Sequence, residues 1–190
     1  GFAATYKSNK PGPTVVFLAE YDALAGLGHG CGHNVFGATS SLAGAALKSV
    51  VDQIGGEVRV YGTPGEEGGQ NGSAKGSFVK KGYLKDVDFA VLSHAHYDHA
   101  NGMEKFFEIN EKAPFYLQEG CGENCYFKKG FVRKYIGIPK GITKRYQDRI
   151  KYVSGICPIA EGIYLVPHST PHLEQIGKKE MMYQKTKLGW

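Results

Sequence analysis

The chain has 190 residues, a length that suits one domain or two very small ones. Hydrophobic residues make up 42% and charged residues 22%, so a hydrophobic core of useful size can form. The sequence contains no apolar run of about 18 residues or more, which excludes a membrane-spanning helix.

The formal net charge is +5, and the whole excess of basic residues lies in residues 91–190. Much of it falls between Lys128 and Lys151. Such a stretch could attract phosphates or nucleic acid, but a charge run alone is a weak signal and no aromatic platform interleaves with it. We interpret it as a solvated surface insertion, and we do not expect nucleic acid as a partner.

The four cysteines are few and irregularly spaced, which is not typical of a secreted disulfide framework. Cys121 and Cys125 could hold a zinc ion, but no second Cys or His pair follows at zinc-ribbon spacing. No signal peptide is visible at the start of the chain. We therefore expect reduced thiols and a cytoplasmic location.

The first half alternates strands and helices. Apolar runs separated by glycine-rich loops predict strands at residues 15–19, 57–61 and 87–92 and helices at residues 37–54 and 73–82. This order predicts a mostly parallel sheet covered by helices. Ligands of such sheets gather at the carboxyl ends of the strands. The apolar stripe of the longer helix should face the sheet, and it contains Leu42, Ala46, Val50 and Ile54.

The second half has a less regular pattern. It predicts a helix at residues 103–110 and strands at 114–117, 150–153 and 162–166, of which the last two could pair antiparallel. Residues 120–148 read as a long irregular stretch. The predicted fold class is therefore α/β, with a mixed α/β second half that carries an irregular basic insertion.

A histidine-rich loop follows the strand at residues 87–92. His94 and His96 alternate, so in an extended backbone their side chains point the same way and can bind one metal ion. Asp98 and His99 can bind a second ion beside it. Two ions about 3.5–4 Å apart can activate a bridging water for hydrolysis.

Residues 91–102 (VLSHAHYDHANG) resemble the signature of the metallo-β-lactamase-fold hydrolases, in the branch of dihydropterin-ribofuranosyl-aminobenzene-phosphate synthase-like proteins. The resemblance runs from about Leu84 to the end. It implies that His94 and His96 bind a first zinc ion and that Asp98 and His99 bind a second. Asp98 would also orient the attacking nucleophile. His168 and His172 do not match the downstream ligand motif and are expected to be loop residues.

The first half carries different motifs. Residues 18–24 (LAEYDAL), 28–34 (GHGCGHN) and 62–69 (GTPGEEGG), in this order and spacing, resemble the zinc amidohydrolases that include aminoacylases and p-aminobenzoyl-glutamate hydrolase. The resemblance implies hydrolysis of an N-acyl amino acid or a peptide-like amide.

The residue types of these motifs suit that chemistry. Cys31, His33 and Glu67 are expected to hold zinc, and Cys31 could bridge two ions. Glu66 would be the general base that passes a proton from water to the leaving amine. The alternative is structural: Cys31 as a small buried residue, and Glu66 with Glu67 at a helix N-terminus. We interpret Glu20 and Asp22 as supports rather than ligands, and His29 as structural or supporting.

Two fragments are therefore predicted, an amidohydrolase catalytic fragment at residues 1–90 and a metallo-β-lactamase-like fragment at residues 91–190. The join falls within residues 82–93, and His94 could serve either site. An engineered hybrid, a natural recombinant and an assembly artefact are all open origins. Both families have segments beyond those recognisable here, so we expect both sites to be incomplete.

The predicted function is metal-dependent hydrolysis of the binuclear-zinc type, with amide hydrolysis as the first interpretation. Hydrolysis of an ester, phosphoester or lactam at the histidine-rich loop is the alternative, and a metal-binding protein without significant catalysis is the third. The expected cofactor is one or two zinc ions, with manganese or iron as alternatives. The expected partner is a small-molecule substrate and not a membrane, and the oligomeric state stays open.

Overall fold

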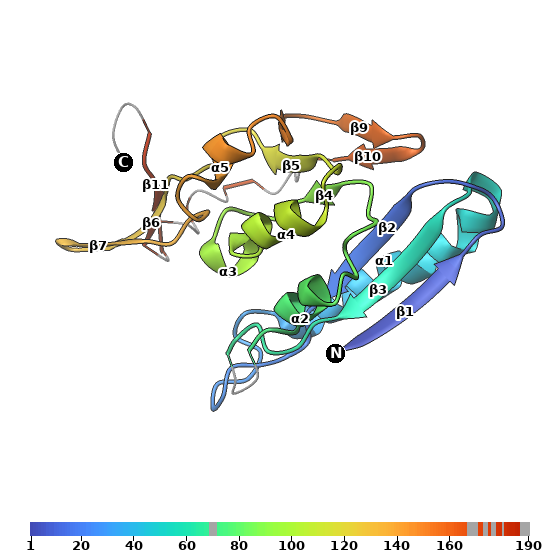
Figure 1. Cartoon of the computed structure of the whole chain (residues 1–190). Coiled ribbons are helices and arrows are strands. Elements are labelled where there is room, and N and C mark those ends of the chain that lie inside the picture. Colours follow the sequence, from blue (N-terminus) through green and yellow to red (C-terminus); the bar gives the residue numbers. More distant parts are fainter. Residues whose placement is uncertain (69–71, 167–170, 173–174, 176–177, 180, 187–190) are drawn as a thin grey trace. The chain divides into compact units, whose positions relative to one another are not determined.

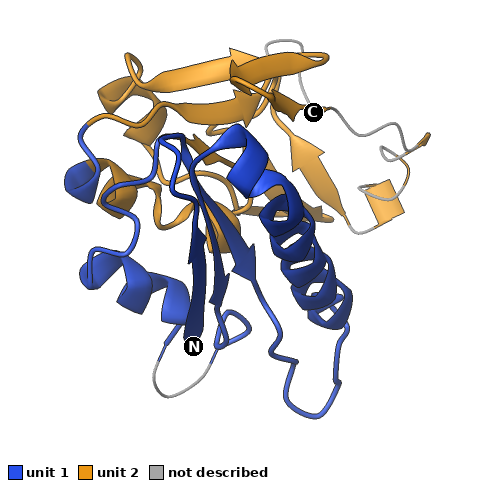
Figure 2. Cartoon of the chain, turned by 90° about the vertical axis from the view of Figure 1, so that its right-hand side faces the viewer, with its two compact units in different colours: residues 1–88, 108–111 blue, residues 89–107, 112–190 orange. Residues whose placement is uncertain are grey.

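The computed structural model describes residues 1–68, 72–166, 171–172, 175, 178–179 and 181–186 (Figure 1). His168 lies outside the described residues. The chain divides into two compact units, Gly1–Asp88 with Glu108–Glu111, and Phe89–Phe107 with Lys112–Trp190 (Figure 2). Each unit has a sheet with helices beside it, so the fold class is mixed α/β, as expected from the sequence. Among the described residues, no helix combines the length and the apolar character needed to cross a bilayer.

A three-stranded mixed sheet forms the centre of the first unit. It consists of β1 (Phe2–Lys7), β2 (Thr14–Ala19) and β3 (Glu57–Gly62) in the order β1-β3-β2. The runs TVVFLA and EVRVYG are rich in β-branched and aromatic residues, which favour strands. The pair β2–β3 is parallel, with Ala19 opposite Gly62 at its carboxyl end, and β1 pairs with β3 antiparallel.

The predicted sheet was wrong in its third strand. The strand predicted at residues 87–92 is the short β4 (Ala90–Val91), and it pairs with β5 (Phe115–Gln118) in the second unit rather than with β2 or β3. Strand β1, which the sequence pattern did not predict, is the other neighbour of β3 instead. Parallel pairing of β2 and β3 is confirmed, and this pair is the part of the prediction on which the candidate site depends.

Helix α1 (His33–Ile54) lies along one face of the first sheet (Figure 1), but not through the predicted stripe. Leu42 is 68% exposed and Ile54 is 54% exposed, whereas Gly44 and Val51 are buried. A Cβ atom at Gly44 would lie 2.3 Å from Val60 Cγ2, so the absence of a side chain allows the helix to approach β3 closely. The helix is apolar on more than one face, and close packing selects the face with the smaller residues.

Helix α2 (Ala74–Lys80) is fixed by a polar cap and an aromatic cluster. The side chain of Ser73 accepts a hydrogen bond from Lys75 N. Phe78 stacks on Tyr61 of β3 with ring centroids 4.8 Å apart, and Tyr83 meets both rings edge-on. This packing attaches the helix firmly to β3.

The segment after α2 returns to the same strand through an ion pair. Arg59 of β3 donates two hydrogen bonds to Asp86, at 2.8 and 2.6 Å, and holds the pKa of that carboxyl below its ordinary value. Because both α2 and its following turn are bound to β3, the first turn of α2 has a defined position beside the end of that strand.

The second unit contains an all-parallel sheet of β4, β5 and β8 (Ile150–Val153). Helices α3 (Tyr97–Ala100) and α4 (Met103–Ile109) follow β4. Phe107 of α4 stacks on Tyr146 at 4.3 Å, and Arg149 lies over the same ring. The predicted helix at 103–110 and the strands at 114–117 and 150–153 are confirmed, although β8 runs parallel to β5.

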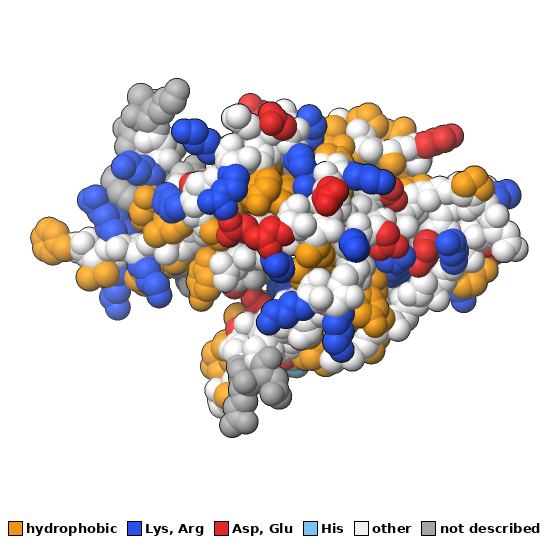
Figure 3. Space-filling model, viewed as in Figure 1, with side chains coloured by type: hydrophobic (Ala, Val, Ile, Leu, Met, Phe, Trp, Pro, Cys, Tyr) orange, Lys and Arg blue, Asp and Glu red, His pale blue; other side chains and the backbone are white. Residues whose placement is uncertain are grey.

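The predicted irregular stretch at residues 120–148 is wrong, because it contains regular elements. Strands β6 (Cys125–Lys129) and β7 (Val132–Tyr135) form a hairpin, β11 (Met182–Gln184) pairs with β6, and α5 (Ile142–Arg145) follows. Strand β9 (Cys157–Ala160) pairs antiparallel with β10 (Ile163–Leu165). Basic side chains gather where β6 and β7 lie (Figure 3), so the basic stretch is a structured hairpin and not a loop.

We expect substitution of Gly44 by alanine to destabilise the first unit. Alanine raises helix propensity, but its Cβ would overlap Val60, so the net loss should be about 1–2 kcal/mol. Gly76 of α2 is the matched control, because a Cβ there meets no atom within 4 Å. Urea unfolding should show a lower midpoint for Gly44→Ala and an equal or higher midpoint for Gly76→Ala. Equal midpoints for the two variants would contradict the close packing of α1 on β3.

Candidate metal centre

The loops after β2 and β3 bring acidic residues to one edge of the first sheet. Glu20 and Asp22 follow β2, and Glu66 and Glu67 follow β3. Because the two strands are parallel and end in register, their loops leave the sheet at the same edge. A hydrogen bond from Thr63 N to Ala19 O, 2.9 Å long, continues the pairing beyond the strands. The strand pair therefore places four carboxylates together.

The imidazole of His33, the first residue of α1, lies among these four carboxylates. Its Nε2 atom is 3.2 Å from Glu20 Oε2 and 3.5 Å from Glu66 Oε2. Its Nδ1 atom is 3.5 Å from Asp22 Oδ1 and 3.7 Å from Glu67 Oε1. All five side chains are largely buried, with exposed fractions between 3% and 16%. We call these residues the His33 cluster: Glu20, Asp22, His33, Glu66 and Glu67.

Glycines allow the helix start to approach the acidic loops. A Cβ at Gly37 would lie 2.6 Å from the carbonyl oxygen of Glu20. Gly32, the residue that precedes α1, has a φ of 77°, which other residues rarely adopt. The glycines that surround His33 in the sequence therefore serve the close approach of α1 to the loop after β2.

The ammonium group of Lys75 contacts the His33 cluster. Lys75 Nζ forms an ion pair with Glu20 Oε1 and lies 4.0 Å from Glu66 Oε1. Asp22 Oδ2 accepts a hydrogen bond of 3.0 Å from the backbone N–H of Glu67, which links the two acidic loops. The cluster has four buried carboxylates beside this lysine, so it is rich in negative charge.

The donor set of the His33 cluster fits a divalent metal ion. Carboxylate oxygens and an imidazole nitrogen are ligands for zinc, manganese and iron. Glu20, His33 and Glu66 offer ligand atoms that lie within 4.8 Å of one another. Among the described residues, the buried atoms His33 Nδ1 and Asp22 Oδ1 have no hydrogen-bond partner. Buried polar atoms are rarely left in this state, and a cation that binds them removes the cost.

The structure gathers part of the first predicted ligand set. His33, Glu66 and Glu67 come together, and Glu20 and Asp22, which we interpreted as supports, contact His33 directly. Cys31 is exposed on the turn before α1, and within the described part of the chain no ligand group includes it. Its role as a ligand stays a prediction. His29 is also exposed.

Sequence reasoning missed Lys75. The only signal is its place two residues after Ser73, a residue type that favours the start of a helix. That signal predicts a helix start but not a contact with a residue 55 positions earlier in the chain. The contact arises because α2 is attached to β3 by its aromatic residues.

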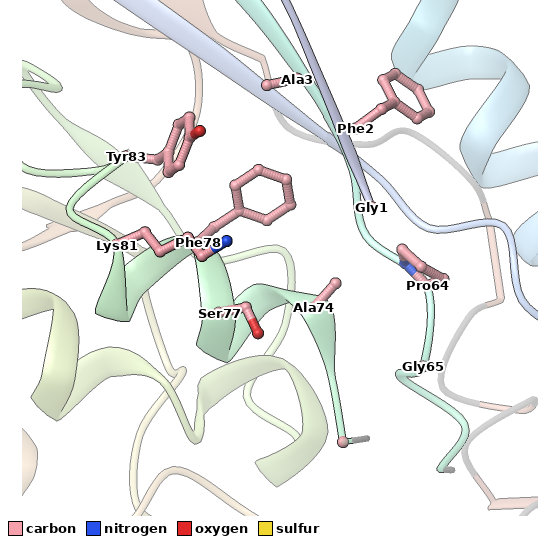
Figure 4. A pocket seen from close by; sticks show the side chains of 11 residues that line it. Gly1, Phe2, Ala3, Pro64, Gly65, Ala74, Ser77, Phe78, Lys81 and Tyr83 are labelled. Atoms are coloured by element: carbon pink, nitrogen blue, oxygen red, sulfur yellow. The ribbon is translucent and has the colours of Figure 1, made fainter. Parts of the chain in front are cut away.

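A cavity of about 580 Å³ lies beside α2, but it does not include the His33 cluster. Phe78 and Tyr83 line it together with the first residues of β1 (Figure 4). Its lining contains Pro64, Gly65 and Ala74, the sequence neighbours of Glu66 and Lys75, but none of the five cluster side chains. We therefore do not assign the proposed chemistry to this cavity.

The histidine-rich loop of the second unit brings three imidazoles together. The ring centroids of His94 and His96 are 4.8 Å apart, and those of His94 and His99 are 4.0 Å apart. Ser93 Oγ lies 3.3 Å from Nδ1 of both His94 and His99. Asp98 Oδ2 is 3.8 Å from His99 Nε2, and the Asp98 side chain is 42% exposed. The loop therefore has metal-ligand chemistry of its own and is more open to solvent than the His33 cluster.

The family of the chain follows from a comparison with known protein families. The family model of the metallo-beta-lactamase superfamily matches residues 64–176, which is more than half of the chain. The chain belongs to the metallo-beta-lactamase superfamily. The matched range contains the histidine-rich loop, and this agrees with the resemblance found at residues 91–102.

This superfamily member is also similar to curated amidohydrolases and peptidases. It is 41% identical over 112 residues to a p-aminobenzoyl-glutamate hydrolase polypeptide of Escherichia coli, covering 49% of this chain and 22% of the relative. It is 31% identical over 106 residues to a mouse Xaa-Arg dipeptidase, covering 54% and 24%. Thermostable carboxypeptidase 2 of Saccharolobus solfataricus is 32% identical over 113 residues, covering 51% and 28%. The matched segment is thus about a quarter of the length of these relatives.

We expect zinc to protect the first unit against opening. A ligand that binds only the folded state at 100 times its dissociation constant should add about 2.7 kcal/mol of stability. Hydrogen exchange of the β2 and β3 amides should slow when zinc replaces EDTA. His33→Ala should abolish this protection, and His29→Ala, which changes an exposed histidine outside the cluster, should retain it. Equal protection in both variants would contradict a metal centre at His33.

Proposed function

We propose that the first unit is a fragment of a metal-dependent amidohydrolase that cleaves an N-acyl amino acid or a peptide-like amide. The observation that carries this proposal is the convergence of four buried carboxylates on the imidazole of His33. The similarity to relatives named as a hydrolase, a dipeptidase and a carboxypeptidase supports amide chemistry. The second unit would be a metallo-β-lactamase-like fragment, with the division at residues 90 and 91.

His33 and Glu67 are the proposed metal ligands within the cluster, and Cys31 is the third ligand suggested by the sequence. A bound zinc, manganese or iron ion would polarise the amide carbonyl and make water a stronger acid. Asp22 lies beside His33 Nδ1 and is itself held by the N–H of Glu67, so it can fix the orientation of the imidazole. One or two ions are compatible with the donor set.

Glu66 is the proposed general base. Its side chain is only 6% exposed, and it points toward the same imidazole as the other cluster carboxylates. Glu66 would take a proton from the attacking water and deliver it to the amide nitrogen as the C–N bond breaks. The products are a carboxylate and a free amine, and the carboxylate of Glu66 is regenerated.

Glu66→Gln should lower the rate of amide hydrolysis by about 10²–10⁴-fold, because glutamine cannot accept the proton. Zinc content should stay equal to that of the parent protein. Glu111→Gln is the control, since Glu111 is an exposed glutamate of the same unit. Amine release from N-acyl amino acids and dipeptides is the assay. Unchanged turnover in Glu66→Gln would rule out its role as the base.

A second candidate function belongs to the histidine-rich loop. The superfamily match over residues 64–176 and the three adjacent imidazoles favour hydrolysis of an ester, phosphoester or lactam there. In this proposal, His94 and His96 hold a first zinc ion, while Asp98 and His99 hold a second. Asp98 also orients the attacking water. Whether His94 completes the His33 cluster instead is part of the same proposal.

The double variant His96→Ala with Asp98→Ala should remove one pool of bound zinc and abolish phosphodiester or lactam hydrolysis. Amide hydrolysis should persist, because Glu66 and His33 are unchanged. His172→Ala, a histidine outside the loop, is the control. Zinc content after dialysis and parallel assays on both substrate classes would separate the two sites. Bound zinc without turnover in either assay would favour a metal-binding protein that is not an enzyme.

A further inference from the structure

Lys75 reaches the carboxylates that surround the proposed metal ion of the first unit. The ammonium forms an ion pair with Glu20 Oε1 and lies 4.0 Å from Glu66 Oε1. The other oxygens of these two carboxylates, Glu20 Oε2 and Glu66 Oε2, lie 3.2 and 3.5 Å from His33 Nε2. Glu20 is therefore shared between an ammonium and an imidazole, and Glu66 faces the same two groups.

The fold holds the lysine in this place. Lys75 is in the first turn of α2, where its backbone N–H donates to Ser73 Oγ. The aromatic contacts of Phe78 with Tyr61 and Tyr83 fix the helix on β3. The lysine side chain is only 21% exposed, so its ammonium is directed into the cluster rather than into solvent.

The two sides of the imidazole differ in charge. On the Nε2 side, the charge of Glu20 and Glu66 is partly neutralised by Lys75. On the Nδ1 side, the described contacts of Asp22 and Glu67 with His33 include no lysine or arginine. A compact ammonium with three donors can occupy a position between carboxylates that a metal cation also favours. Two cations a few ångströms apart in a buried site repel each other.

We infer that Lys75 is an internal counter-ion that competes with the metal for Glu20 and Glu66. The inference rests on the proposed metal centre at His33. Without metal, the ammonium stabilises carboxylates that would otherwise repel one another. When a divalent ion binds, the same ammonium opposes it, and its contact with the carboxylates loosens. Lys75 therefore stabilises the metal-free fold and weakens metal binding, whereas a lysine with a purely structural role would support both.

The test compares Lys75→Met, which removes the charge but keeps the length of the stem, with Lys75→Arg, which keeps the charge. Urea unfolding in EDTA should show a lower midpoint for Lys75→Met. Competition with a chromophoric zinc chelator should show an affinity at least tenfold higher for Lys75→Met. Lys75→Arg should remain closer to the parent in both measurements. Weaker or unchanged zinc affinity in Lys75→Met would overturn the inference.

A measurement on the parent protein covers the case in which Lys75→Met does not fold. Acylation of Lys75, followed by mass spectrometry, should become faster when zinc is added, because the ammonium loses its contact with Glu20. Lys80 of the same helix is exposed and provides the internal reference. An unchanged rate at Lys75, in protein whose first unit binds zinc, would overturn the inference. If His33→Ala leaves zinc binding unchanged, the proposed metal centre itself is wrong.

Discussion

A buried imidazole among four carboxylates is the constraint on which the first unit depends. The distances of 3.2–3.7 Å from His33 to the carboxylate oxygens bring together charges that repel in a site with little water. The ion pair with Lys75 and the hydrogen bond from the Glu67 amide offset part of this repulsion. Among the groups that the structure describes, the negative charge exceeds the positive charge, and a divalent ion would correct that imbalance.

The remaining structure of this unit keeps the cluster in place. Parallel pairing of β2 and β3 sets both acidic loops at one edge, and Gly37 and Gly44 allow α1 to lie close enough to insert His33. The aromatic cluster of Tyr61, Phe78 and Tyr83 does the same for α2 and its lysine. A loss of packing at any of these contacts would therefore be felt at the site.

Strand order and motif spacing were enough to predict which loops carry the chemistry, because parallel strands end at a common edge. They could not predict that Glu20 and Asp22 touch His33, since the contact depends on how closely α1 approaches. The exposed stripe of Leu42 and Ile54 shows the same limit: a helix that is apolar on several faces does not reveal which one packs. Strand β4 was expected beside β2, but two residues pair with whichever strand the local packing presents, here β5. The β6–β7 hairpin was hidden by its basic residues, which obscure a strand pattern.

Membership of the metallo-beta-lactamase superfamily and similarity to amidohydrolases concern one chain with two groups of ligand-type residues. The metal centre at His33 is the claim from which the proposed amide chemistry and the role of Lys75 follow. Crystals soaked in zinc and measured at the zinc absorption edge would test it most directly. The predicted result is an anomalous peak about 2.0–2.2 Å from a ring nitrogen of His33 and from a cluster carboxylate oxygen. A zinc peak only at the His94–His99 loop, with none beside His33, would contradict it.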